Sequence, residues 1–168
     1  NTFMDFKEVC LAIKQVKIQG ARNVAKAALK AYYMHPDKKH KKILLSLRPT
    51  EPMLQNVLKI ADKTSSKEIL HHFDDAQEKI NKKVMEFLKG KSRIFTHCHS
   101  TNVVNSLIYA KKHGRKFKVF NTETRPLYQG RRTAQELSEA DIPVTLISDL
   151  EADEFIKKAD AVFFGADA

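Results

Sequence analysis

Hydrophobic residues recur at every third or fourth position through most of the first 90 residues, which is the spacing of one buried helix face. The spacing predicts helices over residues 6–16, 24–32, 54–61 and 69–87. Ser65 and Glu68 have the spacing of a capping box, so the last of these helices is expected to begin there. Gly90 stands where a glycine commonly follows a helix end. Residues 1–90 are therefore expected to form an N-terminal helical domain.

Short apolar runs replace the helical spacing after Gly90. They predict strands at residues 93–97, 117–121, 144–148 and 161–165, separated by helical segments. Thr133 and Glu136 form a second capping box, which predicts that the helix before the third strand begins at Thr133. Strands that alternate with helices form a parallel sheet with right-handed crossovers, and strands that are apolar on both faces need helices on both faces. The expected fold class is α/β, with a parallel-sheet domain in residues 91–168.

The charge of the chain is concentrated in its middle. Lys and Arg number 30 against 20 Asp and Glu, a formal net charge of +10, and residues 91–132 alone hold ten basic residues and one acidic residue. Such a band favours an anionic partner, either a nucleic acid or a phosphorylated small molecule, although a solvated basic surface has the same composition. The lysines do not alternate with aromatic residues as in many nucleic-acid sites. Composition alone does not decide between RNA and a phosphate ligand.

Composition also predicts the compartment. No apolar run approaches the ~18 residues of a membrane span, and the first residues lack a basic segment followed by an apolar one. Two cysteines do not make a disulfide framework. We therefore expect a cytoplasmic protein without a membrane partner.

Polar and reactive residues follow each predicted strand, at the sheet edge where ligands bind in open α/β proteins. They are Cys98 after the first strand, Glu123–Arg125 after the second, Asp149 after the third and Asp167 after the fourth. The chain lacks the glycine-rich motifs of dinucleotide and P-loop nucleotide sites, which removes the main support for binding of those kinds.

Cys98 is the strongest candidate for chemistry. It stands just before a helix expected to begin near Thr101, and a helix N-terminus stabilises a thiolate. A buried, inert cysteine is the alternative. His97 and His99 are expected to point to opposite sides of an extended segment, so the sequence disfavours a zinc site formed by the three adjacent residues.

Two aspartates accompany this thiol. Asp167, paired with Cys98, would supply the second proton-handling group of an acid/base couple, whereas a helix cap or a turn residue is the alternative. Asp149 is the weaker carboxylate, and it is expected to cap the helix that follows it.

Three arginines beside glycine- or proline-bearing turns suggest a phosphate site. Arg22 follows Gly20 and Ala21 at a helix start, where backbone amides can hold an anion. Arg48 precedes a proline, and Arg125 directly follows a strand. Guanidinium groups bind phosphate oxygens through two parallel hydrogen bonds. An arginine of this kind taken alone is more often a surface residue, and the three together predict a phosphate pocket.

Three strings of residues together resemble the translation initiation factor 2B alpha/beta/delta-subunit family. They are residues 96–100 (Thr-His-Cys-His-Ser), 122–130 (Thr-Glu-Thr-Arg-Pro-Leu-Tyr-Gln-Gly) and 165–167 (Gly-Ala-Asp). Residues 18–25 and 48–51 resemble the N-terminal motifs of the same family. The likeness covers nearly the whole chain and is greatest to the archaeal ribose-1,5-bisphosphate isomerases, relatives of methylthioribose-1-phosphate isomerase.

The resemblance implies a helical domain followed by a Rossmann-like domain without the dinucleotide motif. It implies isomerisation of a sugar phosphate in AMP salvage, with Cys98 and Asp167 as the catalytic pair and without a metal or other cofactor. The matching residues of the phosphate pocket would be Gly20, Ala21, Arg22, Arg48, Arg125 and Gln129. AMP is the candidate activator, and a dimer or larger homo-oligomer is expected. A non-catalytic regulatory subunit that binds a nucleotide or a sugar phosphate is the alternative, and an RNA-binding role ranks third.

The chain also departs from the family pattern. Relatives usually continue from Gly-Ala-Asp into a further segment with more sheet, so the Rossmann-like domain and its site are expected to be incomplete in these 168 residues. Glu151 adds a negative charge near the expected phosphate pocket. Gln19 stands where many of the isomerases have a basic residue, which removes one phosphate partner.

Overall fold

The computed structural model describes residues 4–166 and places them in two compact units. The first unit takes the described residues up to Asp74 together with Ala166, and the second runs from Asp75 to Gly165. The sequence pattern changes from helices to sheet at residue 90, whereas the compact units divide earlier. The reason is that Gln77 and Val84, in the second half of a long helix, pack with the residues of the sheet unit.

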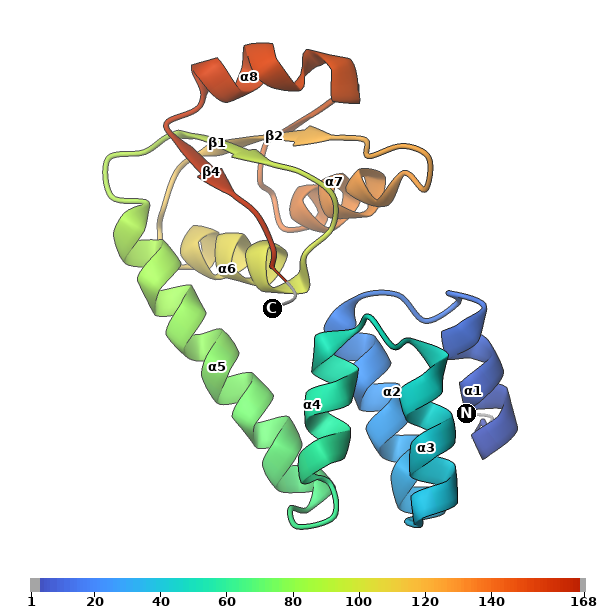
Figure 1. The fold of residues 1–168 in the computed structure, drawn as a ribbon. Helices are drawn as coiled ribbons and strands as arrows, with labels where there is room; N and C mark the ends of the chain where they lie inside the picture. Colours follow the sequence, from blue (N-terminus) through green and yellow to red (C-terminus); the bar gives the residue numbers. More distant parts are fainter. Residues whose placement is uncertain (1–3, 167–168) are drawn as a thin grey trace. The chain divides into compact units, whose positions relative to one another are not determined.

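Helices whose apolar faces meet in one core make up the first unit (Figure 1). They are α1 (Phe6–Lys14), α2 (Ala21–Met34), α3 (Lys38–Leu47), α4 (Pro52–Ile60) and the first turns of α5 (Ser66–Phe87). Two signals read from the sequence are confirmed at the ends of α5. The Glu68 N–H donates to Ser65 Oγ at 3.3 Å while the Ser65 N–H donates to Glu68 Oε2 at 2.9 Å, and Gly90 has a φ of +71°.

Helix α3 is the one element of this unit that the hydrophobic spacing does not predict. Four lysines and a histidine fill its first five positions, and Leu44 is its buried residue. Asp37 caps it, because the Asp37 side chain accepts a hydrogen bond from the His40 N–H at 2.9 Å. The helix therefore has a short apolar face in its second half, where Leu45 and Leu47 join Leu44 against the core, behind a charged first half that Asp37 caps.

Over the described residues, the second unit holds a four-stranded parallel sheet in the order β3-β2-β1-β4 (Figure 1). The strands are β1 (Arg93–Thr96), β2 (Lys118–Thr122), β3 (Val144–Ile147) and β4 (Ala161–Phe163). Helices α6 (Thr101–Lys112) and α7 (Gln129–Glu139) lie on one face, and the turn η1 (Asp149–Glu151) with α8 (Ala152–Lys158) lies on the other. The α/β fold class is confirmed. None of the helices within residues 4–166 is long and apolar enough to cross a membrane.

The two faces of the sheet are covered unequally. On the α6 and α7 side, Leu107 and Leu137 pack with Ile94 and Val119 in a large apolar layer, whereas α8 contributes a smaller layer centred on Phe155. The outer strands β3 and β4 are partly uncovered, with Leu146 43% exposed and Val162 39% exposed. The prediction that helices cover both faces therefore holds fully for the central strands β1 and β2 and in part for the outer strands, where Val144 and Ile147 of β3 pack in the layers on opposite faces.

Helix α7 begins four residues before the predicted start. Its first residue is Gln129, and the preceding Tyr128 adopts a left-handed φ of +52°. The second capping box is wrong, because Thr133 lies inside the helix and its hydroxyl donates to the carbonyl oxygen of Cys98 at 2.9 Å. Glu136 instead accepts from Arg132 Nε at 2.7 Å.

Asp160 joins the start of β1 to the start of β4, and it predicts a pH dependence of stability. Its carboxylate accepts hydrogen bonds from the Ser92 N–H, the Arg93 N–H and the Arg93 guanidinium, and the Arg93 bond is the largest of the causes that hold its pKa well below the usual range. A carboxyl with a lowered folded-state pKa stabilises the fold above its unfolded-state pKa of about 4, and this contribution is lost as the pH falls.

We expect Asp160→Asn to lower the melting temperature at pH 7 and to bring it closer to that of the unmodified protein as the pH falls toward 3. Thermal unfolding between pH 3 and 7 measures both effects. Asp153→Asn is the matched control, since Asp153 is an exposed carboxylate paired with Lys157 on the surface of α8. An equal loss of stability at pH 3 and pH 7 for Asp160→Asn would contradict the assignment.

Candidate functional site

Cys98 lies on the loop between β1 and α6 in a left-handed conformation, with a φ of +63°. Three hydrogen bonds hold it there. Its N–H donates to Thr124 Oγ1 at 2.9 Å, its carbonyl oxygen accepts from Thr133 Oγ1 at 2.9 Å, and its thiol donates to Gln129 Oε1 at 3.1 Å. A left-handed conformation costs a non-glycine residue free energy, which these bonds offset. The sequence-based expectation of an extended segment at Cys98 is therefore wrong.

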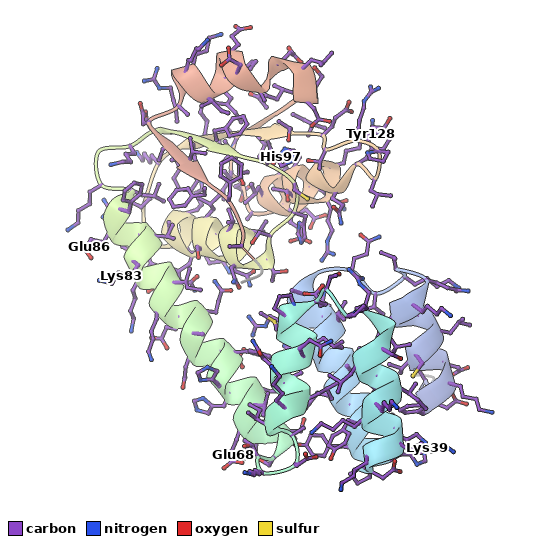
Figure 2. All side chains as sticks on the ribbon, viewed as in Figure 1. Lys39, Glu68, Lys83, Glu86, His97 and Tyr128 are labelled. Carbon is purple, nitrogen blue, oxygen red and sulfur yellow. The ribbon has the colours of Figure 1, made fainter. Side chains whose placement is uncertain are left out.

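The two histidines beside Cys98 contact different threonines. Nδ1 of His97 lies 2.5 Å from Thr122 Oγ1, while Nδ1 of His99 lies 3.0 Å from Thr133 Oγ1. Figure 2 shows His97 near the sheet edge, on the side where Tyr128 marks the loop before α7. His97 is exposed and His99 is buried, so the two rings occupy different environments.

The hydrogen bonds fix the tautomer of His99. Because the Thr133 hydroxyl gives its proton to the Cys98 carbonyl, Nδ1 of His99 must be the donor to Thr133 and Nε2 carries the lone pair. Burial lowers the pKa of His99, and the nearby Arg132 lowers it further against the opposing charge of Glu136. His99 therefore serves as a neutral donor that supports Thr133.

Asp149 organises the loop after β2. Its carboxylate oxygens accept from the Thr124 N–H at 2.9 Å and from the Arg125 N–H at 2.8 Å. These bonds, that of the Arg125 N–H above all, lower the pKa of Asp149. The prediction that Asp149 caps the following helix is wrong, because Ser148 and Glu151 form the capping box of η1.

Glu123 holds two arginines in front of the same loop. Arg125 Nε lies 2.6 Å from one carboxylate oxygen of Glu123 and Arg131 lies 3.2 Å from the other, and hydrogen bonds to the two guanidinium groups lower the pKa of Glu123. The Arg131 guanidinium lies 4.0 Å from the centre of the Tyr128 ring and that of Arg125 lies 5.7 Å from it. Both arginine side chains are more than half exposed while the Glu123 side chain is only 12% exposed, so the loop presents two guanidinium groups to solvent over a largely buried carboxylate.

The remaining residues of the predicted phosphate pocket belong to the helical unit. Gly20 precedes α2 with a φ of +82°, and no side chain caps this helix N-terminus. Arg22 pairs with Asp74 and lies over the ring of Phe73, while Arg48 lies 3.6 Å from the buried Glu51. Ala21 is the first residue of α2. Each of the three predicted phosphate-binding arginines is thus paired with a carboxylate.

The fourth strand ends beside the loop of Cys98. Thr96 Oγ1 donates to the Phe163 carbonyl at 2.9 Å, and a Cβ atom on Gly165 would come within 2.4 Å of Ser100 Oγ. A side chain at residue 165 would therefore collide with the start of α6, which explains a glycine at this position. Asp167 lies outside the described residues.

The structure brings together the ends of three strands that the sequence analysis treated separately. Cys98 after β1 bonds to Thr124 after β2, and Thr124 bonds to Asp149 after β3. The sequence reasoning missed the supporting roles of Thr122, Thr124, Thr133 and Glu123. Hydroxyls at alternate positions, Thr122 and Thr124, at the end of a buried strand are the signal that could have indicated two hydrogen-bonding groups facing one loop. No such signal marks Thr133, because it reaches the Cys98 carbonyl from α7, which is far from the Cys98 loop in the sequence.

Among residues 4–166, no group of three or more His, Cys, Asp or Glu side chains has the arrangement of a metal site. The charged groups around Cys98 are committed to protein partners instead. The chemistry that this arrangement offers is that of a thiol at the carboxyl edge of a parallel sheet, on a loop bonded to the segment that carries Arg125.

Comparison with curated proteins gives relatives with an isomerase name. The chain is 31% identical to ribose 1,5-bisphosphate isomerase from Thermococcus kodakarensis and 36% identical to the protein of the same name from Methanocaldococcus jannaschii, in each case over 96% of this chain and 61% of the relative. A methylthioribose-1-phosphate isomerase from Dehalococcoides mccartyi is 37% identical over 59% of the chain. The chain thus spans about three-fifths of the length of the ribose 1,5-bisphosphate isomerases.

Comparison with solved structures supports the fold. The translation initiation factor eIF-2B from Pyrococcus horikoshii superposes with a TM-score of 0.81 at 21% identity, over 96% of this chain and 66% of that one. The tetrameric eIF2B-beta2-delta2 complex from C. thermophilum contains a chain that superposes with a TM-score of 0.76 at 18% identity. Residues 18–168 match the sequence profile of the Initiation factor 2 subunit family. With nine-tenths of its length matched and this fold in common, the chain belongs to the Initiation factor 2 subunit family.

Proposed function

We propose that the protein is an isomerase of a sugar phosphate and that its substrate is ribose 1,5-bisphosphate, which it converts to ribulose 1,5-bisphosphate. The observation that carries the proposal is the Cys98 loop. Its thiol is held at the carboxyl edge of the sheet by bonds from two other elements, in a chain whose relatives at 31% and 36% identity are named for this reaction. Residues held in a left-handed backbone conformation cluster at active sites, which supports a chemical role for Cys98.

The reaction needs groups that move protons. The ring opens when the bond between C1 and the ring oxygen breaks and that oxygen gains a proton. A proton leaves C2, another is returned to C1, and the C2 hydroxyl becomes the ketone as it loses its proton. Two groups on opposite sides of C1 and C2 can carry out these transfers as general acid and base. We assign them to Cys98 and Asp167.

The position of β4 supports this pairing. Gly165 packs against Ser100, and these two residues stand two positions from Asp167 and Cys98 in the sequence. Strands β1 and β4 are parallel neighbours, so the segments that follow them leave the same edge of the sheet.

For the two phosphates we propose Gly20, Ala21, Arg22, Arg48 and Arg125. The free amides at the start of α2 suit one phosphate, since no side chain caps that helix. The Arg125 guanidinium is exposed and can bind phosphate oxygens through two parallel hydrogen bonds, so we propose that a phosphate takes the place of the Glu123 carboxylate on Arg125. Family resemblance adds Gln129 to this pocket, and it adds AMP as activator and a homo-oligomeric assembly.

A second candidate function is a non-catalytic subunit that binds a sugar phosphate or a nucleotide. One observation favours it. A relative from Pyrococcus furiosus, 26% identical, is named a putative translation initiation factor eIF-2B subunit 2-like protein.

Binding and turnover measured together separate the two candidates. Both predict that ribose 1,5-bisphosphate stabilises the full-length protein, by about 2.7 kcal/mol at a ligand concentration of 100 dissociation constants. The isomerase alone forms ribulose 1,5-bisphosphate in a coupled assay, run with and without AMP. Stabilisation without product would favour the binding subunit, and neither effect would refute both proposals.

A further inference from the structure

Gln129 contacts the thiol of Cys98 directly. Its side-chain oxygen lies 3.1 Å from Sγ, within the range of a sulfur hydrogen bond, and the residue stands at the first position of α7. This placement suggests a role at the thiol rather than at a phosphate.

We propose that Gln129 is a positioning residue that accepts a hydrogen bond from the thiol of Cys98, so that the thiol is aimed along one direction when substrate arrives. The proposal rests on the isomerase function, because it gives Gln129 a part in that reaction. It differs from the family-based assignment of Gln129 to the phosphate pocket.

The backbone of Cys98 is fixed on both sides, so rotation about the side-chain bond is the main freedom left to the thiol. Thr124 fixes the Cys98 N–H and Thr133 fixes the Cys98 carbonyl, each at 2.9 Å. With N–H and carbonyl both held, the direction of Sγ depends on its own partner. Gln129 supplies that partner from the helix that also carries Thr133, so one rigid element sets both the backbone and the thiol.

Gln129 is itself held in place by the turn before α7. The Gly130 N–H donates to the Glu123 carbonyl and the Gly130 carbonyl accepts from Asn121 Nδ2 at 2.7 Å. A Cβ atom on Gly130 would lie 1.7 Å from the Thr122 carbonyl oxygen, so this turn is in close contact with the end of β2. Gln129 is therefore fixed relative to the sheet.

Other charged groups on the surrounding elements have partners of their own. Those on the described residues of the loops after β1, β2 and β3 and on the start of α7 are His97, His99, Glu123, Arg125, Arg131, Arg132 and Asp149. His97 and His99 bond to threonines, the arginines pair with Glu123 or Glu136, and Asp149 bonds to backbone amides. Asp167 is the further carboxylate that the proposed function brings to the thiol. The neutral amide of Gln129 is the side chain bonded to Sγ in the described structure.

Alkylation of Cys98 by iodoacetamide tests the role without substrate. The thiolate is the reacting form, and a carboxylate beside it opposes its formation. We expect Gln129→Glu to slow the alkylation of Cys98 in the full chain at pH 8 about tenfold, which is the effect of raising the midpoint of thiol titration by one pH unit. Gln129→Met removes the hydrogen-bond acceptor. We expect it to raise the alkylation rate at pH 7.5, divided by the rate at pH 10, about two- to fivefold, which corresponds to the loss of one hydrogen bond. Dividing by the rate at pH 10 cancels any change in how easily iodoacetamide reaches Cys98.

The chain offers two matched controls. Gln135→Glu makes the same charge change on the exposed side of α7, where Gln135 bonds to Glu139, and it should leave the Cys98 rate unchanged. Cys10, in the helical unit, is an internal reference in every sample, because peptide mass spectrometry resolves it from Cys98. Equal alkylation rates for the unmodified protein and Gln129→Glu would overturn the proposal.

Turnover provides the second readout. A positioning role predicts that Gln129→Met lowers kcat for ribose 1,5-bisphosphate with little change in KM, whereas a phosphate contact predicts a raised KM at unchanged kcat, which would overturn the proposal. If the unmodified protein shows no turnover while the alkylation rates follow the expected order, the isomerase function fails and the contact between Gln129 and the thiol stands.

Discussion

Replacing Cys98 by serine is expected to reduce turnover of ribose 1,5-bisphosphate by the full-length protein about 10²–10⁴-fold, the usual contribution of a general acid or base. A hydroxyl is a much weaker acid than a thiol, so serine cannot exchange a proton with the sugar at neutral pH. The fold should survive, because the backbone bonds of residue 98 to Thr124 and Thr133 do not involve Sγ. Steady-state kinetics with a product assay measure the loss, and thermal unfolding measures the fold.

The control for this experiment is Cys10→Ser. Cys10 packs at the edge of the helical core, and burial raises the pKa of its thiol, which makes it a poor participant in proton transfer. We expect Cys10→Ser to keep its turnover. A Cys98→Ser protein with full activity would remove the thiol from the mechanism.

Gly130→Ala is expected to reduce the free energy of unfolding by about 3 kcal/mol or more, toward the upper end of the cost of overpacking. The added Cβ would lie 1.7 Å from the Thr122 carbonyl oxygen and 3.0 Å from Asn121 Nδ2, and the first of these is backbone that cannot rotate away. Helix α7 must then move off the end of β2, which also moves Gln129 away from Cys98. Urea unfolding of the full chain measures the loss of stability, and Cys98 alkylation reports the change at the thiol.

Gly114→Ala is the matched control. Nothing lies within 4 Å of a Cβ atom at Gly114, but its φ is +86°, so the cost is that of a left-handed alanine, about 1–2 kcal/mol. If Gly130→Ala cost no more than Gly114→Ala, the close packing of α7 on β2 would be contradicted.

Local signals in the sequence predicted most elements because those signals act over a few residues. The capping box of Ser65 and Glu68 operates within one helical turn, and it forms as predicted. The equivalent spacing of Thr133 and Glu136 fails, because the Thr133 hydroxyl is used by the carbonyl of Cys98. A spacing rule cannot anticipate a partner that the fold brings from 35 residues away.

The candidate site was predictable to the level of the sheet edge. Parallel strands place their carboxyl ends together, and the structure joins those of β1, β2 and β3 through Thr124 and Asp149. The left-handed backbone of Cys98 and the contact of its thiol with Gln129 depend on how α7 packs, so the strand pattern did not predict them. The pairing of Arg22 with Asp74 was likewise set by the fold, since these residues are far apart in the sequence, whereas Arg48 and Arg125 pair with glutamates two or three residues away.

A crystal structure of the full-length protein with ribose 1,5-bisphosphate or its product tests the central claim most directly. The account predicts the C1–C2 bond of the sugar between Cys98 Sγ and the Asp167 carboxylate, each about 3–3.5 Å from the atom it serves, with Gln129 still on the thiol. It also predicts a phosphate on the arginines, with Glu123 released from Arg125. A ligand bound away from Cys98, or an Asp167 carboxylate that cannot reach the sugar, would contradict the isomerase mechanism.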